Sequence, residues 1–383
     1  MKSSKVDTGI NCSFCGRSRD EVKMLIAGQE GHICENCIEH AHEIIDKEFH
    51  QKKSDGKPST LKVQKPTAIK AFLDQYIIGQ DDAKKILSVA VYNHFKRVAQ
   101  KPQADDVEIE KSNIIMVGET GTGKTLLAKT IARLLNVPFA IVDATVFTEA
   151  GYVGEDVESM LTRLLQNCDY DVAAAERGIV YVDEIDKIAR KGDNPSITRD
   201  VSGEGVQQAL LKLVEGTKCK VSVNGGKKHP ALDQVEIDTS KILFIAGGAF
   251  ANLERIVERR QKGTGIGFNS TQKTEVDVTQ ATPEDFIQFG MIPEFCGRFP
   301  ISVSINELSK EDFVRILTEP KNNLIAQMQF YFTSDSVELV FTPDAVSAVA
   351  EQAFEQKLGA RGLKSVLERV LMPYMYTLAE VKK

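Results

Sequence analysis

The stretch Gly118-Glu-Thr-Gly-Thr-Gly-Lys-Thr125 is a GxxxxGK[ST] motif that stands between an apolar run and a segment with helical spacing. Residues 113–117 predict a short buried strand, and residues 126–135 predict a helix. In this context the glycines allow a tight turn whose N–H groups, with the helix N-terminus, face the phosphates of a nucleotide. The lysine would reach the β and γ oxygens, and the last threonine would bind Mg²⁺. The predicted nucleotide-binding residues are Gly118, Glu119, Thr120, Gly121, Thr122, Gly123, Lys124, Thr125 and Leu126.

An acidic pair, Asp183-Glu184, directly follows the apolar run 179–182. Such a pair is often only a solvated turn. However, strands of a parallel sheet carry their chemistry at their carboxyl ends, and this strand is almost wholly apolar. We therefore expect Asp183 to bind the same Mg²⁺ and Glu184 to orient or deprotonate the attacking water, as ATP hydrolysis requires.

Length and composition indicate a soluble protein of two or three domains. The chain has 383 residues, of which 42% are hydrophobic and 27% charged. The net charge of −6 argues against a sequence-independent nucleic-acid binder. No apolar run approaches the roughly 18 residues of a membrane span, and the N-terminus MKSSKVDTG lacks a signal-peptide core. We expect a cytoplasmic protein that binds neither membrane nor nucleic acid.

Four of the seven cysteines form two CxxC pairs, Cys12 with Cys15 and Cys34 with Cys37. This spacing is typical of a structural Zn²⁺ site with four thiolate ligands. Disulfides and a redox CxxC are the alternatives. A cytosolic chain disfavours disulfides, and two pairs at this spacing argue against redox chemistry. The other three cysteines, Cys168, Cys219 and Cys296, are scattered, and we expect them to be buried small hydrophobic residues.

The order of elements indicates an α/β protein with several domains. Strand-like runs at 113–117, 138–142, 179–182 and 241–246 alternate with helical segments, which favours a parallel sheet with helices on both faces. The polar, proline-containing stretch at residues 50–66 predicts a flexible linker. Beyond about residue 308 the pattern is mostly helical, with a short strand expected near Val337–Phe341. The expected domains are a zinc-binding domain at 1–50, a linker at 51–66, a large α/β domain at 67–308 and a smaller α+β domain at 309–383.

Several motifs in one order resemble a known family. They are the four-cysteine segment, the GxxxxGKT loop, the VDEID box, Gly151-Tyr-Val-Gly154, an Ile-Gly-Phe tripeptide, PEFCGRFP and GARGL. The sequence is similar in this respect, over essentially its whole length, to the ClpX subfamily of AAA+ unfoldases. The resemblance implies an AAA+ P-loop large domain, a small domain and a treble-clef or ribbon-like zinc domain. It also implies a homohexameric ATPase that recognises proteins and adaptors, unfolds its substrates and threads them into the ClpP peptidase.

The resemblance assigns further nucleotide-site residues. Arg298, in PEFCGRFP, resembles the arginine finger that enters the neighbouring subunit's site, and Arg361, in GARGL, resembles the second sensor arginine. Ile77 and Ile78, which follow Tyr76, look like the adenine-side wall. The family pattern also expects a polar first sensor after the fourth strand. That strand ends in Ala-Gly-Gly here, so no residue is assigned.

The resemblance also assigns residues that touch substrate or peptidase. Tyr152 and Val153 would form the pore loop that grips a threaded polypeptide, and Arg199 resembles part of a second pore loop. Lys227, Lys228 and His229 stand where the family usually has Arg-Lys-His, so substrate preference is open. Apolar residues in a polar, glycine-rich loop would dock into clefts on ClpP, namely Ile266, Gly267 and Phe268.

Three alternative functions remain at this point. A zinc-ribbon AAA+ ATPase acting on DNA would need a basic surface, which 54 acidic against 48 basic residues do not supply. An HslU-type unfoldase with another peptidase would lack the zinc domain. A zinc-dependent adaptor whose P-loop only senses nucleotide would not need an intact Glu184.

Overall fold

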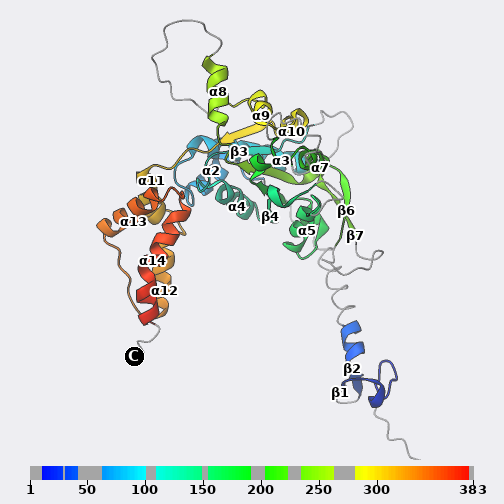
Figure 1. Cartoon of the computed structure of the whole chain (residues 1–383). Coiled ribbons are helices and arrows are strands. Elements are labelled where there is room, and N and C mark those ends of the chain that lie inside the picture. Colours follow the sequence, from blue (N-terminus) through cyan, green and yellow to red (C-terminus); the bar gives the residue numbers. More distant parts are fainter. Residues whose placement is uncertain are drawn as a thin grey trace, which may run out of the picture. The chain divides into compact units, whose positions relative to one another are not determined.

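The computed structural model of the chain divides into two compact units, Met1–Thr60 and Leu61–Lys383, which are described separately (Figure 1). The residues that the structure describes are 11–28, 31–41, 63–100, 109–148, 154–190, 203–222, 234–262 and 281–378.

The first unit is a small hairpin followed by a helix. Strands β1 (Leu25–Ala27) and β2 (His32–Cys34) pair antiparallel, and residues 35–41 continue as a helix. A single 3-10 turn, η1 (Arg19–Glu21), precedes the hairpin and begins with a capping box between Ser18 and Glu21. This arrangement brings the turn that contains Cys12 and Cys15 next to Cys34, at the end of β2, and Cys37, in the first turn of the helix.

The second unit is built on a parallel sheet. In its described part, five strands are hydrogen-bonded in the order β4-β5-β8-β3-β9, and every neighbouring pair is parallel. The strands are β3 (Ile114–Val117), β4 (Phe139–Asp143), β5 (Ile179–Asp183), β8 (Leu243–Gly248) and β9 (Ile301–Ser304).

Helices cover both faces of this sheet, which explains why its strands are almost continuously apolar. Along β3, Ile114 and Met116 pack with α2, α3 and α4, whereas Ile115 and Val117 point into the core beneath α5, α7, α9 and α10. The first group of helices is α2 (Pro66–Asp74), α3 (Asp81–Ala99) and α4 (Lys124–Leu135). The second is α5 (Ser159–Gln166), α7 (Glu204–Glu215), α9 (Pro283–Phe289) and α10 (Pro293–Arg298).

Short elements complete the large domain. Strands β6 (Lys218–Ser222) and β7 (Gln234–Asp238) form an antiparallel hairpin. The remaining elements are η2 (Ala144–Val146), α6 (Val172–Ala175), η3 (Ile185–Ile188), η4 (Thr239–Lys241) and α8 (Leu253–Lys262).

None of the helices in the described ranges is long and apolar enough to cross a membrane.

The fold class predicted from the sequence is confirmed, and the structure adds two features. All four expected strands are present, although β8 begins and ends about two residues later than 241–246. The fifth strand, β9, and the β6–β7 hairpin were not predicted. The signal for β9 was available in the alternation of Ile301, Val303 and Ile305, but it is only a few residues long and follows a proline.

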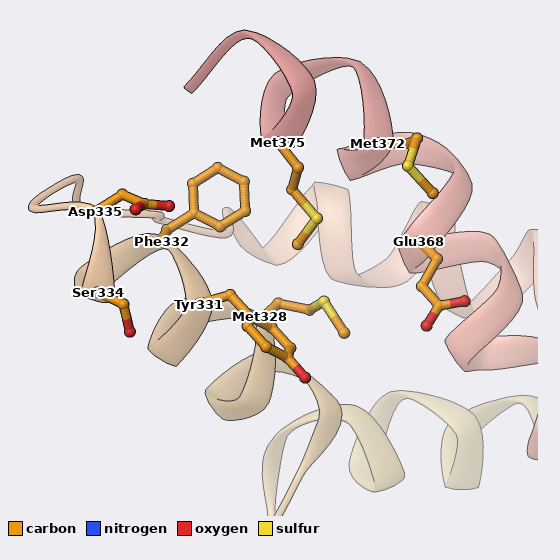
Figure 2. A pocket seen from close by; sticks show the side chains of 8 residues that line it. All are labelled: Met328, Tyr331, Phe332, Ser334, Asp335, Glu368, Met372 and Met375. Carbon is orange, nitrogen blue, oxygen red and sulfur yellow. The ribbon is translucent and has the colours of Figure 1, made fainter. Parts of the chain in front are cut away.

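The small domain consists of helices. These are α11 (Lys310–Thr318), α12 (Leu324–Ser334), α13 (Pro343–Glu355) and α14 (Arg361–Leu378). The strand expected near Val337–Phe341 is wrong, because this segment pairs with no strand in the described part of the chain. Its apolar side chains pack instead on a cluster formed by α12 and α14. A cavity of about 440 Å³ lies between these two helices, where Met328, Phe332 and Met375 gather (Figure 2).

Asn113, just before β3, joins the sheet to two helices of the large domain. Its side chain is buried, and its amide nitrogen donates hydrogen bonds to the carbonyls of Val214 (3.1 Å) and Arg298 (2.9 Å). The oxygen of the same side chain, Oδ1, accepts a hydrogen bond from the N–H of Phe244 on β8. One buried amide thus makes hydrogen bonds to three backbone groups, which need partners away from water.

We predict that Asn113→Ala lowers the free energy of unfolding by about 3 kcal/mol, because buried backbone groups would lose their partners. Asn167→Ala is the matched control. Asn167 also donates to a carbonyl, that of Phe139, but it is exposed. Chemical unfolding of both variants is the measurement, and equal losses would contradict the role given to Asn113.

Candidate functional site

The loop between β3 and α4 has the geometry that its glycines permit. Gly121 and Gly123 have φ angles of 86° and 105°, which other residues rarely adopt, and Gly123 is the N-cap of α4. The first backbone N–H groups of α4 have no partner within the helix and are available to an anion. The predicted strand–loop–helix unit is therefore present as expected.

Lys124 lies inside this loop. Its side chain is 7% exposed, and Nζ donates to the carbonyls of Gly118 (2.6 Å) and Glu119 (2.8 Å). Burial lowers the pKa of Lys124 below its ordinary value, and the carboxylates of Asp183 and Asp186 oppose this shift. The ammonium group is held where phosphate oxygens would be better acceptors than neutral carbonyls.

Thr125 and Asp183 lie together, although they come from different parts of the chain. The hydroxyl of Thr125 donates to Asp183 Oδ2 at 3.3 Å. A hydroxyl beside a carboxylate is a set of hard oxygen ligands, which suits Mg²⁺. Strands β3 and β5 are separated by β8, so the two side chains meet across the end of that strand.

Glu184 follows Asp183 in an unusual backbone conformation. Its φ and ψ angles of 55° and 34° are left-handed, which is uncommon for a residue other than glycine. Its side chain is exposed and lines the same cavity as Lys124 and Thr125. Strained conformations of this kind are concentrated at functional sites.

These residues line one cavity of about 810 Å³ between the large and small domains. Arg361, the first residue of α14, lines it as well. The small domain contacts the loop directly, since the N–H of Ala360 donates to the carbonyl of Gly121 at 3.1 Å. A Cβ atom added to Gly121 would lie 2.6 Å from the carbonyl oxygen of Leu358, and one added to Gly359 would lie 2.8 Å from Gly121 Cα.

The predicted adenine-side residues occupy different places. Tyr76 lines the cavity, whereas Ile77 and Ile78 are 6% and 7% exposed and are absent from its described lining. Ile77 packs in the core beneath α3. The guanidinium of Arg133 lies 4.0 Å from the centre of the Tyr76 ring, on the side of a neighbouring cavity.

The end of β8 explains why no first sensor could be assigned there. A Cβ at Gly247 would lie 2.1 Å from the hydroxyl oxygen of Tyr181, and one at Gly248 would lie 2.7 Å from Asp186 Oδ1. Tyr181 and Asp186 are residues of the site that sequence reasoning missed. The available signals were a tyrosine in an otherwise aliphatic strand and the glycine pair itself.

Arg298 lies away from this cavity. It ends α10, its side chain is 48% exposed, and its Nε is 3.0 Å from Glu215 Oε1. It does not belong to the lining that the described residues form around Lys124. Nine other residues predicted from the resemblance lie outside the described residues: Tyr152, Val153, Arg199, Lys227, Lys228, His229, Ile266, Gly267 and Phe268.

The first unit holds the four cysteines together. The sulfurs of Cys12, Cys15, Cys34 and Cys37 all lie within 4.8 Å of one another, and those of Cys15 and Cys34 are 3.7 Å apart. Tetrahedral thiolates at 2.3 Å from a zinc ion would be separated by about 3.8 Å. The N–H of Cys34 donates a hydrogen bond to Cys12 Sγ, and a thiolate that binds a metal can accept such a bond. The donor set and its spacing therefore fit Zn²⁺.

We predict that Cys15→Ser removes zinc and unfolds the first unit, because so small a core depends on its metal. The second unit should keep its structure. Zinc content and amide hydrogen exchange of each unit are the measurements. Cys168→Ser, which changes a cysteine outside the cluster, is the control and should retain zinc. Loss of structure throughout the chain would show that the units depend on each other.

Family models match the segments of the chain that contain both sites. Three family models match: a ClpX C4-type zinc finger at residues 10–47, an AAA domain of the Cdc48 subfamily at 109–302, and the C-terminal D2-small domain of ClpB protein at 308–380.

Curated relatives match over nearly the full chain. A protein of Bacteroides fragilis named ATP-dependent Clp protease ATP-binding subunit ClpX is 54% identical over 373 residues, which is 95% of this chain and 90% of the relative. Proteins of the same name from Bacteroides thetaiotaomicron and Porphyromonas gingivalis are 53% and 52% identical. They cover 100% and 97% of this chain, and 94% and 92% of their own lengths. With a ClpX-type zinc finger, an AAA domain and these relatives, the chain belongs to the ClpX family of AAA proteins.

Proposed function

We propose that this chain is the ATP-hydrolysing subunit of a ring that unfolds proteins and translocates them into the ClpP peptidase. The observation that carries the proposal is the meeting of Lys124, Thr125, Asp183 and Glu184 around one cavity, in a chain of the ClpX family. An intact acidic pair beside a P-loop is what hydrolysis requires, and binding alone would not need it.

The residues divide the chemistry among themselves. On nucleotide binding Lys124 exchanges its two carbonyl acceptors for phosphate oxygens. Thr125 and Asp183 would hold Mg²⁺, which would neutralise charge on the transferring phosphoryl group. Glu184, exposed at the cavity, accepts a proton from the attacking water. Arg361 contacts the nucleotide from the small domain. The segment 76–78 approaches the adenine through Tyr76, which lines the cavity, while Ile77 and Ile78 support it from the core.

The position of Arg298 supports the proposed ring. A cation is needed at the transferring phosphate, and Arg298 is outside the cavity of its own chain as far as the described residues define it. We propose that it enters the site of the next subunit in a homohexamer, where it leaves Glu215 for the nucleotide.

Substrate handling is assigned to the segments outside the described residues. Tyr152 and Val153 grip the polypeptide, and Arg199 with the segment 227–229 contacts it near the pore mouth. Residues 266–268 dock on ClpP. Protein substrates and adaptors are the partners, in the cytoplasm. Stimulation of ATP hydrolysis by DNA instead of by unfoldable protein would favour a DNA-acting AAA+ protein.

We predict that Glu184→Gln binds ATP normally but hydrolyses it at least about 100-fold more slowly, because the general base is lost. Steady-state hydrolysis and equilibrium ATP binding are the measurements. Glu311→Gln is the control, since it makes the same change at an exposed glutamate that is absent from the described lining of the cavity. Turnover of Glu184→Gln within twofold of the unaltered chain would remove Glu184 from the mechanism.

We predict that Arg298→Ala and Lys124→Ala are each inactive but regain activity when mixed. In mixed rings an Arg298→Ala subunit has an intact P-loop, and a Lys124→Ala neighbour supplies the arginine. Random mixing at equal amounts restores up to about a quarter of the interfaces. Arg315→Ala is the control, because this arginine is equally exposed and also pairs with a carboxylate. Absence of recovery would place Arg298 in its own subunit's chemistry or in structure.

A further inference from the structure

Tyr181 has a polar group that the proposed mechanism does not use. The residue lies in β5 with 0% of its surface exposed, and its ring belongs to the core beneath α4. Its hydroxyl reaches the carboxyl end of the strand and donates to Asp183 Oδ1 at 3.4 Å. A buried phenol hydroxyl needs a partner, and here the partner is the carboxylate expected to bind the metal.

The two oxygens of Asp183 have different surroundings. Oδ1 accepts the Tyr181 hydroxyl and the N–H of Glu184, the latter at 3.0 Å. Oδ2 faces the hydroxyl of Thr125. Oδ1 thus accepts two hydrogen bonds, from Tyr181 and from the Glu184 N–H, whereas Oδ2 accepts from Thr125, the residue expected to bind Mg²⁺ together with Asp183.

The neighbouring strand is shaped to admit this tyrosine. In β8, a Cβ at Gly247 would lie 2.1 Å from the Tyr181 hydroxyl oxygen and 2.7 Å from the ring carbon that carries it. A side chain at Gly247 would therefore displace the phenol. The hydroxyl of Tyr181, from β5, therefore fills the space that a polar side chain at position 247 of β8 would occupy.

We propose that Tyr181 is a positioning residue for the metal ligand Asp183. Its hydroxyl, from β5, makes the polar contact to Asp183 that the glycines at the end of β8 cannot make. The inference rests on the proposed binding of Mg²⁺ and ATP at this cavity. Hydrogen bonds to metal-ligating carboxylates fix their orientation, and their loss typically lowers metal affinity by about 10- to 100-fold.

The test is Tyr181→Phe, which keeps the ring and removes the hydroxyl. It is made in the Glu184→Gln chain, so that ATP is bound without rapid turnover. ATP affinity is measured with saturating Mg²⁺ and again with EDTA, and the ratio reports how much the metal strengthens binding. We expect this ratio to fall by about tenfold, with the affinity in EDTA unchanged. Tyr92→Phe is the control, because Tyr92 packs against the same core and is absent from the described lining of the cavity.

The outcomes separate this inference from the function on which it rests. An unchanged ratio, or an equal loss of ATP affinity with and without metal, would make Tyr181 a packing residue and overturn the inference. If the parent Glu184→Gln chain binds no ATP, or binds it without help from Mg²⁺, the proposed site itself fails. A thermal unfolding midpoint of Tyr181→Phe close to that of Tyr92→Phe would confirm that the ratio reports the metal site alone.

Discussion

A parallel sheet covered on both faces leaves its strand ends as the place for polar groups, and this constraint determines where the chemistry lies. The β3–α4 loop and the acidic pair after β5 both emerge at the carboxyl ends. Between them stands β8, where a Cβ at Gly247 or Gly248 would meet the hydroxyl of Tyr181 or Oδ1 of Asp186. The two glycines leave room for these side chains, and Thr125 and Asp183 approach to 3.3 Å across the end of the intervening strand. The glycine pair is therefore as necessary to the site as the groups that meet above it.

Local patterns in the sequence predicted those features that depend on neighbouring residues. The GxxxxGKT loop, the four main strands and the cysteine spacing all have their physical cause within a few residues, and the structure agrees with each. The fold class and the family followed from the order of such motifs. The cysteine site could be predicted especially well, because the spacing of four cysteines in two CxxC pairs suffices to define it.

Features that depend on sheet order could not be predicted in this way. Nothing near Tyr181 in the sequence indicates that Gly247 lies beside it, because this contact exists only once β5 and β8 are neighbours. The expectation for Val337–Phe341 was wrong for a related reason. Alternating apolar residues suit a strand, but they suit equally an extended segment that packs on helices, and only the presence of a partner strand distinguishes the two.

The contact between Gly121 and Gly359 has a mechanical consequence. Two backbones that touch without side chains between them form a stiff joint, because no rotamer can change to absorb a displacement. Helix α14 starts two residues beyond this joint and extends for about 18 Å before Pro373, the proline inside it. A rotation of about 5° at the joint would move the end of this segment by about 1.5 Å. A small rearrangement of the loop around phosphate could thus be amplified geometrically at the opposite end of the small domain.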